Sequence, residues 1–242
     1  MLKLNKTFIA NPAAFLKKFV IEYSAALSAA EGELGNMVRT LARGVHDFDL
    51  TQTNAHLGGV VLRPWSERGT RSTWFANRIR AFWLPWRLGK TVSVDLGSLE
   101  ANGAQFFFTS QFDGCRFEIG PGSAPVVAHI PANTDGVTNP SSTAKERDAL
   151  AWRDKESRRI FGDDARPRRF SQTRDYKISR IANVVGKKGS NGRWQFWAQG
   201  INYEMIERKG ERPAVKVIPG PLDEEGNTVI ELSNDRRRAR SL

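Results

Sequence analysis

The sequence predicts an α+β protein, in which helices and strands occupy different stretches of the chain. The N-terminal part and residues 144–161 carry apolar residues at helical spacing, whereas the middle of the chain and the part after residue 165 carry short runs typical of strands. The 242 residues, 40% of them hydrophobic, suffice for one substantial core. No repeat or linker is evident, so a single domain over 1–242 is expected.

The N-terminal part, residues 1–45, is expected to be helical. Asn11 before Pro12 is typical of an N-cap followed by the first helical position. Apolar residues then recur at steps of four or three across 15–30, which predicts an amphipathic helix that covers a sheet. Docking of this helix on a membrane or a secretion chaperone is the alternative. A second helix is expected over 33–43.

Neither a cleaved signal peptide nor a membrane span is predicted. Lys17, Lys18 and Glu22 interrupt every apolar run near the N-terminus. No segment approaches the roughly 20 apolar residues that cross a bilayer. The chain is therefore expected to be soluble, and any export would need a route without a cleaved signal.

Composition narrows the possible chemistry. Cys115 is the single cysteine, which excludes an intrachain disulfide and a thiolate zinc cluster. The formal charge of +11 favours anionic partners, namely nucleic acid, acidic protein surfaces or anionic lipid. His46 and His56 have no spacing that suits a metal site, although His56 could approach Cys115 in space. Neither a metal nor a cofactor is expected.

Residues 72–84 are aromatic and basic, and they predict a helix that stops before Pro85. Their Trp and Phe side chains are expected in the core. Because arginines are interleaved with them, base stacking stays open as the alternative function, a non-enzymatic protein that binds nucleic acid. The basic tail, 233–242, is expected to be flexible.

Strands and one long helix fill the rest of the chain. Residues 90–96 alternate like a strand, and 103–110 continue the strand-rich middle. A helix is expected over 144–161. Three further strand segments are expected within 176–185, 193–207 and 214–220, the first two joined by GKKGSNG.

A hairpin is expected between Cys115 and His129, because the GPGS stretch between them is typical of a turn centred near Gly122. Folding about that centre places Cys115 directly opposite His129 on one face of the hairpin. That face would also hold Phe117, Ile119 and Val127, while Arg116 and Glu118 would point the other way. The pair is either a nucleophile with its base or a buried thiol beside a structural histidine.

The sequence around Cys115 resembles that of the cysteine–histidine glutamine deamidases. These are the cytotoxic necrotizing factor catalytic domain, Burkholderia lethal factor and, more distantly, the chemoreceptor glutamine deamidase. These share a threonine, a short Gly/Ser-containing turn that ends at the nucleophilic cysteine, and a histidine on the following strand. The matching residues are Thr109, Gly114, Cys115 and His129. The toxins have Leu-Ser-Gly-Cys at the turn, so Asp113 is a departure. The match spans about residues 109–129.

The resemblance implies a central β-sheet sandwich flanked by helices, with the catalytic hairpin in the middle of the chain. It implies a toxin-like effector, secreted without a cleaved signal peptide, that converts a protein glutamine to glutamate in the target-cell cytosol, with transglutamination as a side activity. Toxin members act on a Rho-type GTPase or a translation-initiation helicase. Cys115, His129 and Thr109 would be catalytic. Gly114, Gln111 and Asn133 are oxyanion or positioning candidates, with Asp135 a weaker one. A papain-like protease is a further alternative.

Overall fold

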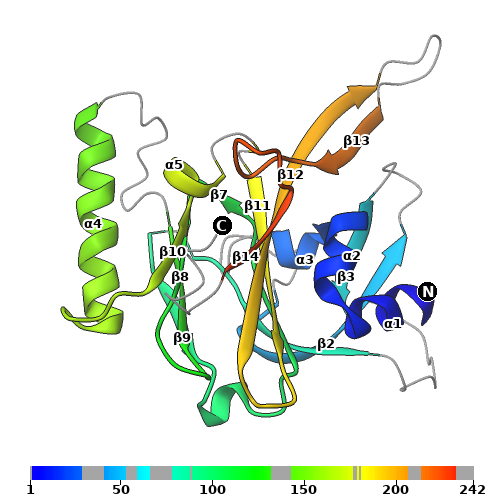
Figure 1. The fold of residues 1–242 in the computed structure, drawn as a ribbon, viewed down its shortest axis with the longest axis horizontal. Helices are drawn as coiled ribbons and strands as arrows, with labels where there is room; N and C mark the ends of the chain where they lie inside the picture. The colour runs from blue at the N-terminus through cyan, green and yellow to red at the C-terminus, as the bar shows by residue number, and fades with distance from the viewer. Residues whose placement is uncertain are drawn as a thin grey trace.

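The computed structural model describes residues 2–28, 41–52, 59–65, 78–87, 89–131, 143–176, 179, 181–206 and 214–232. It has the predicted α+β fold (Figure 1). The helices are α1 (Leu2–Ala10), α2 (Pro12–Lys18), α3 (Ala25–Ser28), the 3-10 turn η3 (Leu99–Ala101), α4 (Thr143–Phe161) and α5 (Gln172–Asp175). The strands are β1 (Val20–Tyr23), β2 (Gly44–Gln52), β3 (Gly59–Pro64), β4 (Ile79–Leu84), β5 (Val92–Asp95), β6 (Phe106–Thr109), β7 (Phe112–Asp113), β8 (Arg116–Ile119), β9 (Val126–Ile130), β10 (Arg168–Ser171), β11 (Ile181–Lys188), β12 (Trp194–Ile206), β13 (Ala214–Pro219) and β14 (Val229–Leu232).

Two sheets pack face to face. The larger is mixed, in the order β1-β3-β2-β4-β6-β11-β12-β13, with β14 beside β12 and β7 beside β11. The smaller is antiparallel, in the order β10-β8-β9-β5. Between them lies one apolar core, to which Phe107 and Phe196 contribute from the larger sheet and Phe117 and Val127 from the smaller. The predicted sheet-centred arrangement is therefore confirmed.

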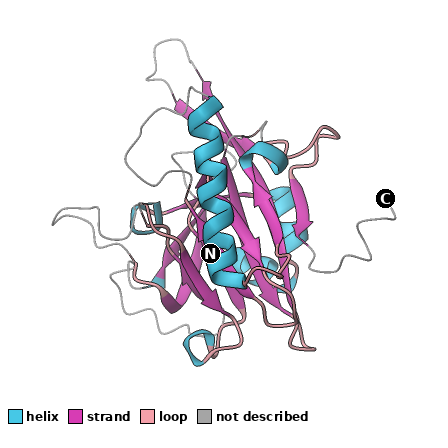
Figure 2. Cartoon of the chain, turned by 90° about the vertical axis from the view of Figure 1, so that its left-hand side faces the viewer, coloured by secondary structure: helices cyan, strands magenta, loops and turns pink. Residues whose placement is uncertain are grey.

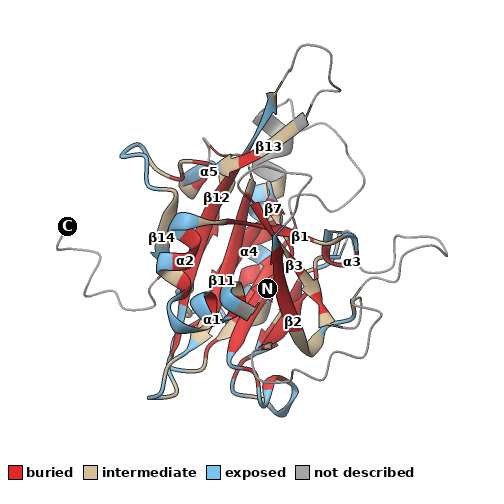
Figure 3. Cartoon of the chain, turned by 90° about the vertical axis from the view of Figure 1, so that its right-hand side faces the viewer, coloured by how far each residue is buried: buried red, intermediate tan, exposed pale blue. Residues whose placement is uncertain are grey.

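Helices cover the outer faces of both sheets. The long helix α4 runs along the smaller sheet, as two views at right angles show (Figures 1 and 2). On the other side α1 and α2 lie over the buried strands of the larger sheet (Figure 3), where Phe8 and Phe15 join a second core with Phe106 and Phe108. None of the described helices is long and apolar enough to cross a membrane.

The prediction of one helix through residues 12–30 is wrong. Asn11 does cap α2, since its side chain accepts from Ala14 N. The helix ends at Lys18, and β1 follows as a wholly buried strand parallel to β3. Apolar residues at a spacing of four predict a helix, but residues 20–23 form a strand. Of the second expected helix, 33–40 lie outside the described residues and 41–43 are not helical.

Two buried amides fasten β1 to the larger sheet. Gln199 Oε1 accepts from Ile21 N at 3.0 Å, and Gln199 Nε2 donates to the carbonyls of Leu16 and Phe19 at 2.6 and 2.7 Å. Asn183 Nδ2 donates to Ile21 O at 2.6 Å. Side chains of β11 and β12 thus supply the hydrogen bonds that a neighbouring strand would otherwise give β1.

The prediction of a helix over 72–84 is also wrong for the part of this range that the structure describes. Residues 79–84 form β4, which pairs with β2 and β6 in the middle of the larger sheet, while 72–77 lie outside the described residues. A strand buried on both faces shows no alternation, so its pattern cannot be told from that of a helix. Phe82 and Trp83 are buried in the core, as expected, and so cannot stack on bases.

Candidate active site

Thr109, Gly114 and Cys115 lie where the chain passes from the larger sheet to the smaller one. Thr109 ends β6 and is fully buried. After β7 in the same sheet, Gly114 turns the chain with φ +81°, a left-handed conformation that favours glycine. Cys115 follows at once, and β8 of the smaller sheet begins with the next residue. Residues from both sheets therefore meet at this turn.

The hairpin forms, but its register differs from the prediction. His129 pairs with Phe117, and not with Cys115. Cys115 thus lies just beyond the last ladder pair, diagonal to His129. The two side chains still share a face, because the shift equals two residues. Cys115 belongs to the core between the sheets, and His129 stacks on Phe112 of that core with ring centroids 4.3 Å apart.

The longer loop explains the shift. Gly120 N donates to Val126 O, so the loop extends over 121–125 instead of closing tightly around Gly122. Trp194 N donates to Ser123 O and holds this loop to the larger sheet. Contacts with a distant strand therefore help set the register.

A hydrogen bond to one of its two ring nitrogens orients His129. Its Nδ1 forms a hydrogen bond with Thr109 Oγ1 at 3.0 Å. Within the described part of the chain, its Nε2 has no hydrogen-bond partner although the ring is buried. Burial lowers the pKa of His129 from 6.5 to about 3, so the imidazole is neutral at physiological pH. In the tautomer in which Nδ1–H donates to Thr109 Oγ1, Nε2 carries a lone pair.

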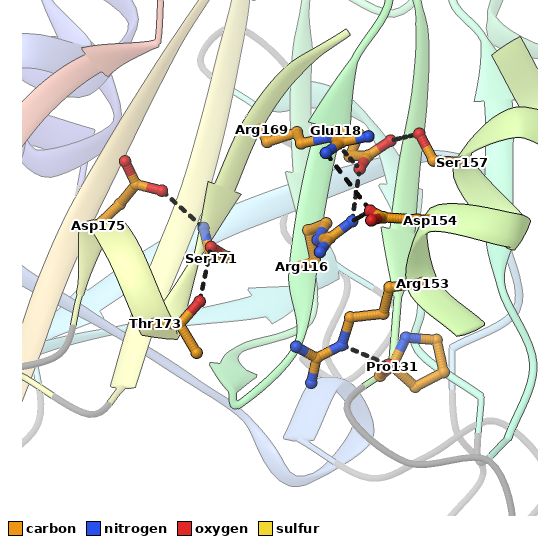
Figure 4. Close-up of polar contacts among 10 residues, drawn as sticks. All are labelled: Arg116, Glu118, Pro131, Arg153, Asp154, Ser157, Arg169, Ser171, Thr173 and Asp175. Carbon is orange, nitrogen blue, oxygen red and sulfur yellow. Dashed lines mark hydrogen bonds and ion pairs between the residues drawn. The ribbon is translucent and has the colours of Figure 1, made fainter. Parts of the chain in front are cut away.

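Cys115 is almost closed off from solvent, with 8% of its surface exposed. The backbone around it is held by two side chains. Tyr176 Oη donates to Cys115 O at 2.6 Å, and Arg153 Nη2 donates to Gly114 O at 2.9 Å. Arg153 Nε also reaches Pro131 O at 3.4 Å, at the end of β9 (Figure 4).

Charged residues lie on the outer face of the hairpin, as predicted. Arg116 bonds Glu118 at 3.3 Å and Asp154 of α4 at 2.7 Å (Figure 4). Glu118 also accepts from Ser157 and pairs with Arg169 at 3.2 Å. Burial raises the pKa of Glu118, although its hydrogen bonds and the arginines oppose this. The network fastens α4 against the hairpin that carries His129.

Of the other candidates, Gln111 and His46 lie in the described part of the chain. Gln111 lies in the short connection between β6 and β7. Asn133, Asp135, His56 and the tail 233–242 lie outside the described residues. His46 Nε2 contacts Ala42 O at 2.8 Å. Among the described residues, no group of three or more His, Cys, Asp or Glu side chains is arranged to hold a metal ion.

Sequence reasoning missed three residues of the site: Phe112, Arg153 and Tyr176. Phe112 lies within the matched stretch, but an aromatic ring there gives no indication that it will stack on an imidazole. Arg153 is one of several arginines in α4, and only the helix's packing distinguishes it. Tyr176 follows a four-residue helix whose position depends on β10.

The chain matches no protein-family model and no curated protein. The geometry of the site and the resemblance in residues 109–129 are therefore the observations that bear on function.

The burial of neutral His129 predicts a pH dependence of stability. Between its folded and unfolded pKa values, about 3 and 6.5, the unfolded chain binds a proton that the folded chain does not. The contribution is thus fully present above pH 6.5 and is lost as the pH falls towards 3, by up to about 1.4 kcal/mol per pH unit. Urea unfolding of wild type and His129→Gln over this range measures it. Parallel stability profiles for the two proteins would contradict the prediction.

Proposed function

We propose that the protein is a cysteine-dependent deamidase that converts a glutamine of a target protein to glutamate. The observation that carries this proposal is the buried, neutral His129, bonded through Nδ1 to Thr109 and placed on the same hairpin face as Cys115. The threonine, cysteine and histidine are those of the resemblance. A histidine with one nitrogen bonded and the other bearing a lone pair suits a general base.

In the first half of the proposed reaction, Cys115 Sγ attacks the carbonyl carbon of the glutamine side chain. His129 Nε2 accepts the thiol proton as the carbon–sulfur bond forms. The backbone N–H of Cys115 donates to the oxyanion. The carbon–nitrogen bond then breaks, and the imidazolium returns the proton to the departing nitrogen, which leaves as ammonia. A thioester on Cys115 results.

In the second half, water attacks the thioester carbon while His129 Nε2 accepts a proton from it. The carbon–sulfur bond breaks, the imidazolium reprotonates the sulfur, and glutamate is released. An amine in place of water would give a transglutaminated product from the same thioester. The resemblance further suggests an effector that acts in the cytosol of a target cell, on a protein such as a GTPase or a helicase.

The test is to incubate a lysate of susceptible cells with wild type or Cys115→Ala and to search by mass spectrometry for glutamine-to-glutamate conversion. We expect one dominant converted glutamine, found only with wild type, in an otherwise intact target. Cleavage fragments in its place would indicate a protease. Identical lysates after both treatments would contradict the proposal, provided that Cys115→Ala has the far-ultraviolet circular dichroism of wild type.

A further inference from the structure

Arg153 bridges the two strands of the hairpin at the point where their ladder stops. The ladder ends before Pro131, which has no N–H to donate. There the guanidinium of Arg153 donates from Nη2 to Gly114 O at 2.9 Å and from Nε to Pro131 O at 3.4 Å. A single buried side chain of α4 thereby ties the end of β9 to the turn that carries Cys115.

This contact also orients the nucleophile's backbone. Gly114 O and the N–H of Cys115 belong to one planar trans peptide, so they point in opposite directions. A donor that holds Gly114 O therefore fixes the direction of the N–H that we assign to the oxyanion. Tyr176 holds the next carbonyl, Cys115 O, at 2.6 Å. The turn is fixed on both sides of its central peptide.

Arg153 also provides a positive charge that His129 does not provide. Burial keeps the imidazole neutral, so the free protein lacks the imidazolium that stabilises the thiolate in many cysteine enzymes. Burial lowers the pKa of Arg153, whereas a negative charge on Cys115 raises it, so the two groups interact. Arginine stays protonated at neutral pH even so. Among the described residues, the other charged or titratable groups that act on this site include Arg116, Asp113, Asp154 and Tyr176.

We propose that Arg153 is a positioning residue that holds the Cys115 turn and favours the Cys115 thiolate through its charge. The inference rests on the proposed function, because it assigns Arg153 a part in the same reaction. It nevertheless makes a statement about the ionisation of a thiol, which can be measured without any substrate.

The test is the rate of Cys115 alkylation by iodoacetamide as a function of pH, followed by intact mass. Cys115 is the single cysteine, so the rate reports on it alone. We expect Arg153→Gln to raise the pH of half-maximal rate by about one to three units, the amount by which a neighbouring arginine lowers the pKa of an acidic side chain. Arg153→Lys keeps the charge and should stay within about half a unit of wild type. An unshifted midpoint in folded Arg153→Gln would overturn the proposal.

Two further variants show whether the shift in the alkylation midpoint is specific to Arg153. Arg159 lies on the same helix, 60% exposed and paired with Glu156, so Arg159→Gln should leave the midpoint where it is in wild type. His129→Gln should shift the midpoint less than Arg153→Gln does, and the reverse order would overturn the proposal. If Arg153→Gln does not fold, Arg153→Lys carries the test, and a rise of a full unit or more in its midpoint would overturn the assignment of the charge.

Failure of the inference and failure of the proposed function are distinguishable. If wild type converts a glutamine but Arg153→Gln leaves the midpoint unshifted, the role of Arg153 is wrong and the function stands. If the midpoint shifts as expected but no glutamine is converted, the function is wrong and the assignment of the charge stands.

Discussion

Replacing His129 by glutamine is expected to lower the rate of glutamine deamidation by roughly 10²- to 10⁴-fold, the usual contribution of a general acid–base group. Glutamine is close to histidine in size and can keep the hydrogen bond to Thr109, but it cannot take up and return a proton. The loss should therefore appear in kcat, with the fold retained. Steady-state rates on the converted protein, or on a peptide around its glutamine, measure it.

The matched control is His46→Gln, since His46 lies on β2 and contacts the carbonyl of Ala42. Its activity should equal that of wild type. Thr109→Val, which removes the hydroxyl beside Nδ1, should cause a smaller loss than His129→Gln, and Thr109→Ser should restore much of the activity. A folded His129→Gln that turns over as fast as wild type would show that another group moves the proton.

Replacing Gln199 by leucine is expected to lower the free energy of unfolding by about 3–5 kcal/mol. The change leaves Ile21 N and the carbonyls of Leu16 and Phe19 without the amide that bonds them. Each buried backbone group left unpaired costs about 1–3 kcal/mol, and partial relaxation offsets some of the sum. Urea or thermal unfolding provides the measurement.

Gln195 offers a control on the same strand, because its side chain is exposed. Gln195→Leu should change the free energy of unfolding by no more than about 0.5 kcal/mol. Equal effects of the two substitutions would mean that the amide of Gln199 does not hold β1 in solution.

Much of the fold could be predicted where a segment satisfies only one periodicity. The helix at 144–161, the strands at 92–95 and 106–109, and the strand segments within 194–206 and 214–219 are all found. The errors fall on strands in which nearly every residue is buried. Residues 20–23 and 79–84 are strands in the larger sheet, and their largely apolar runs suit a helix equally well.

The identities of the site residues could be predicted from the sequence better than their arrangement in space. Thr109, Gly114, Cys115 and His129 come together at the junction of the sheets. Their register could not be derived, because the loop before β9 is held by Trp194, far along the chain. Arg153 could not be found at all. Its place depends on how α4 lies on the smaller sheet, where Asp154 pairs with Arg116 and Ser157 donates to Glu118.

The hydrogen bonds from Gln199 to β1 and to the end of α2 have a consequence for how the chain folds. The hydrogen bonds of Gln199 join residues 178 to 183 positions apart. During synthesis the N-terminal segment must leave the ribosome and wait until β12 has been made, so it cannot fold as an early unit. Pairings over such sequence separations slow folding, because much of the chain must be ordered before they form. We therefore expect the docking of residues 2–28 to be among the last steps of folding.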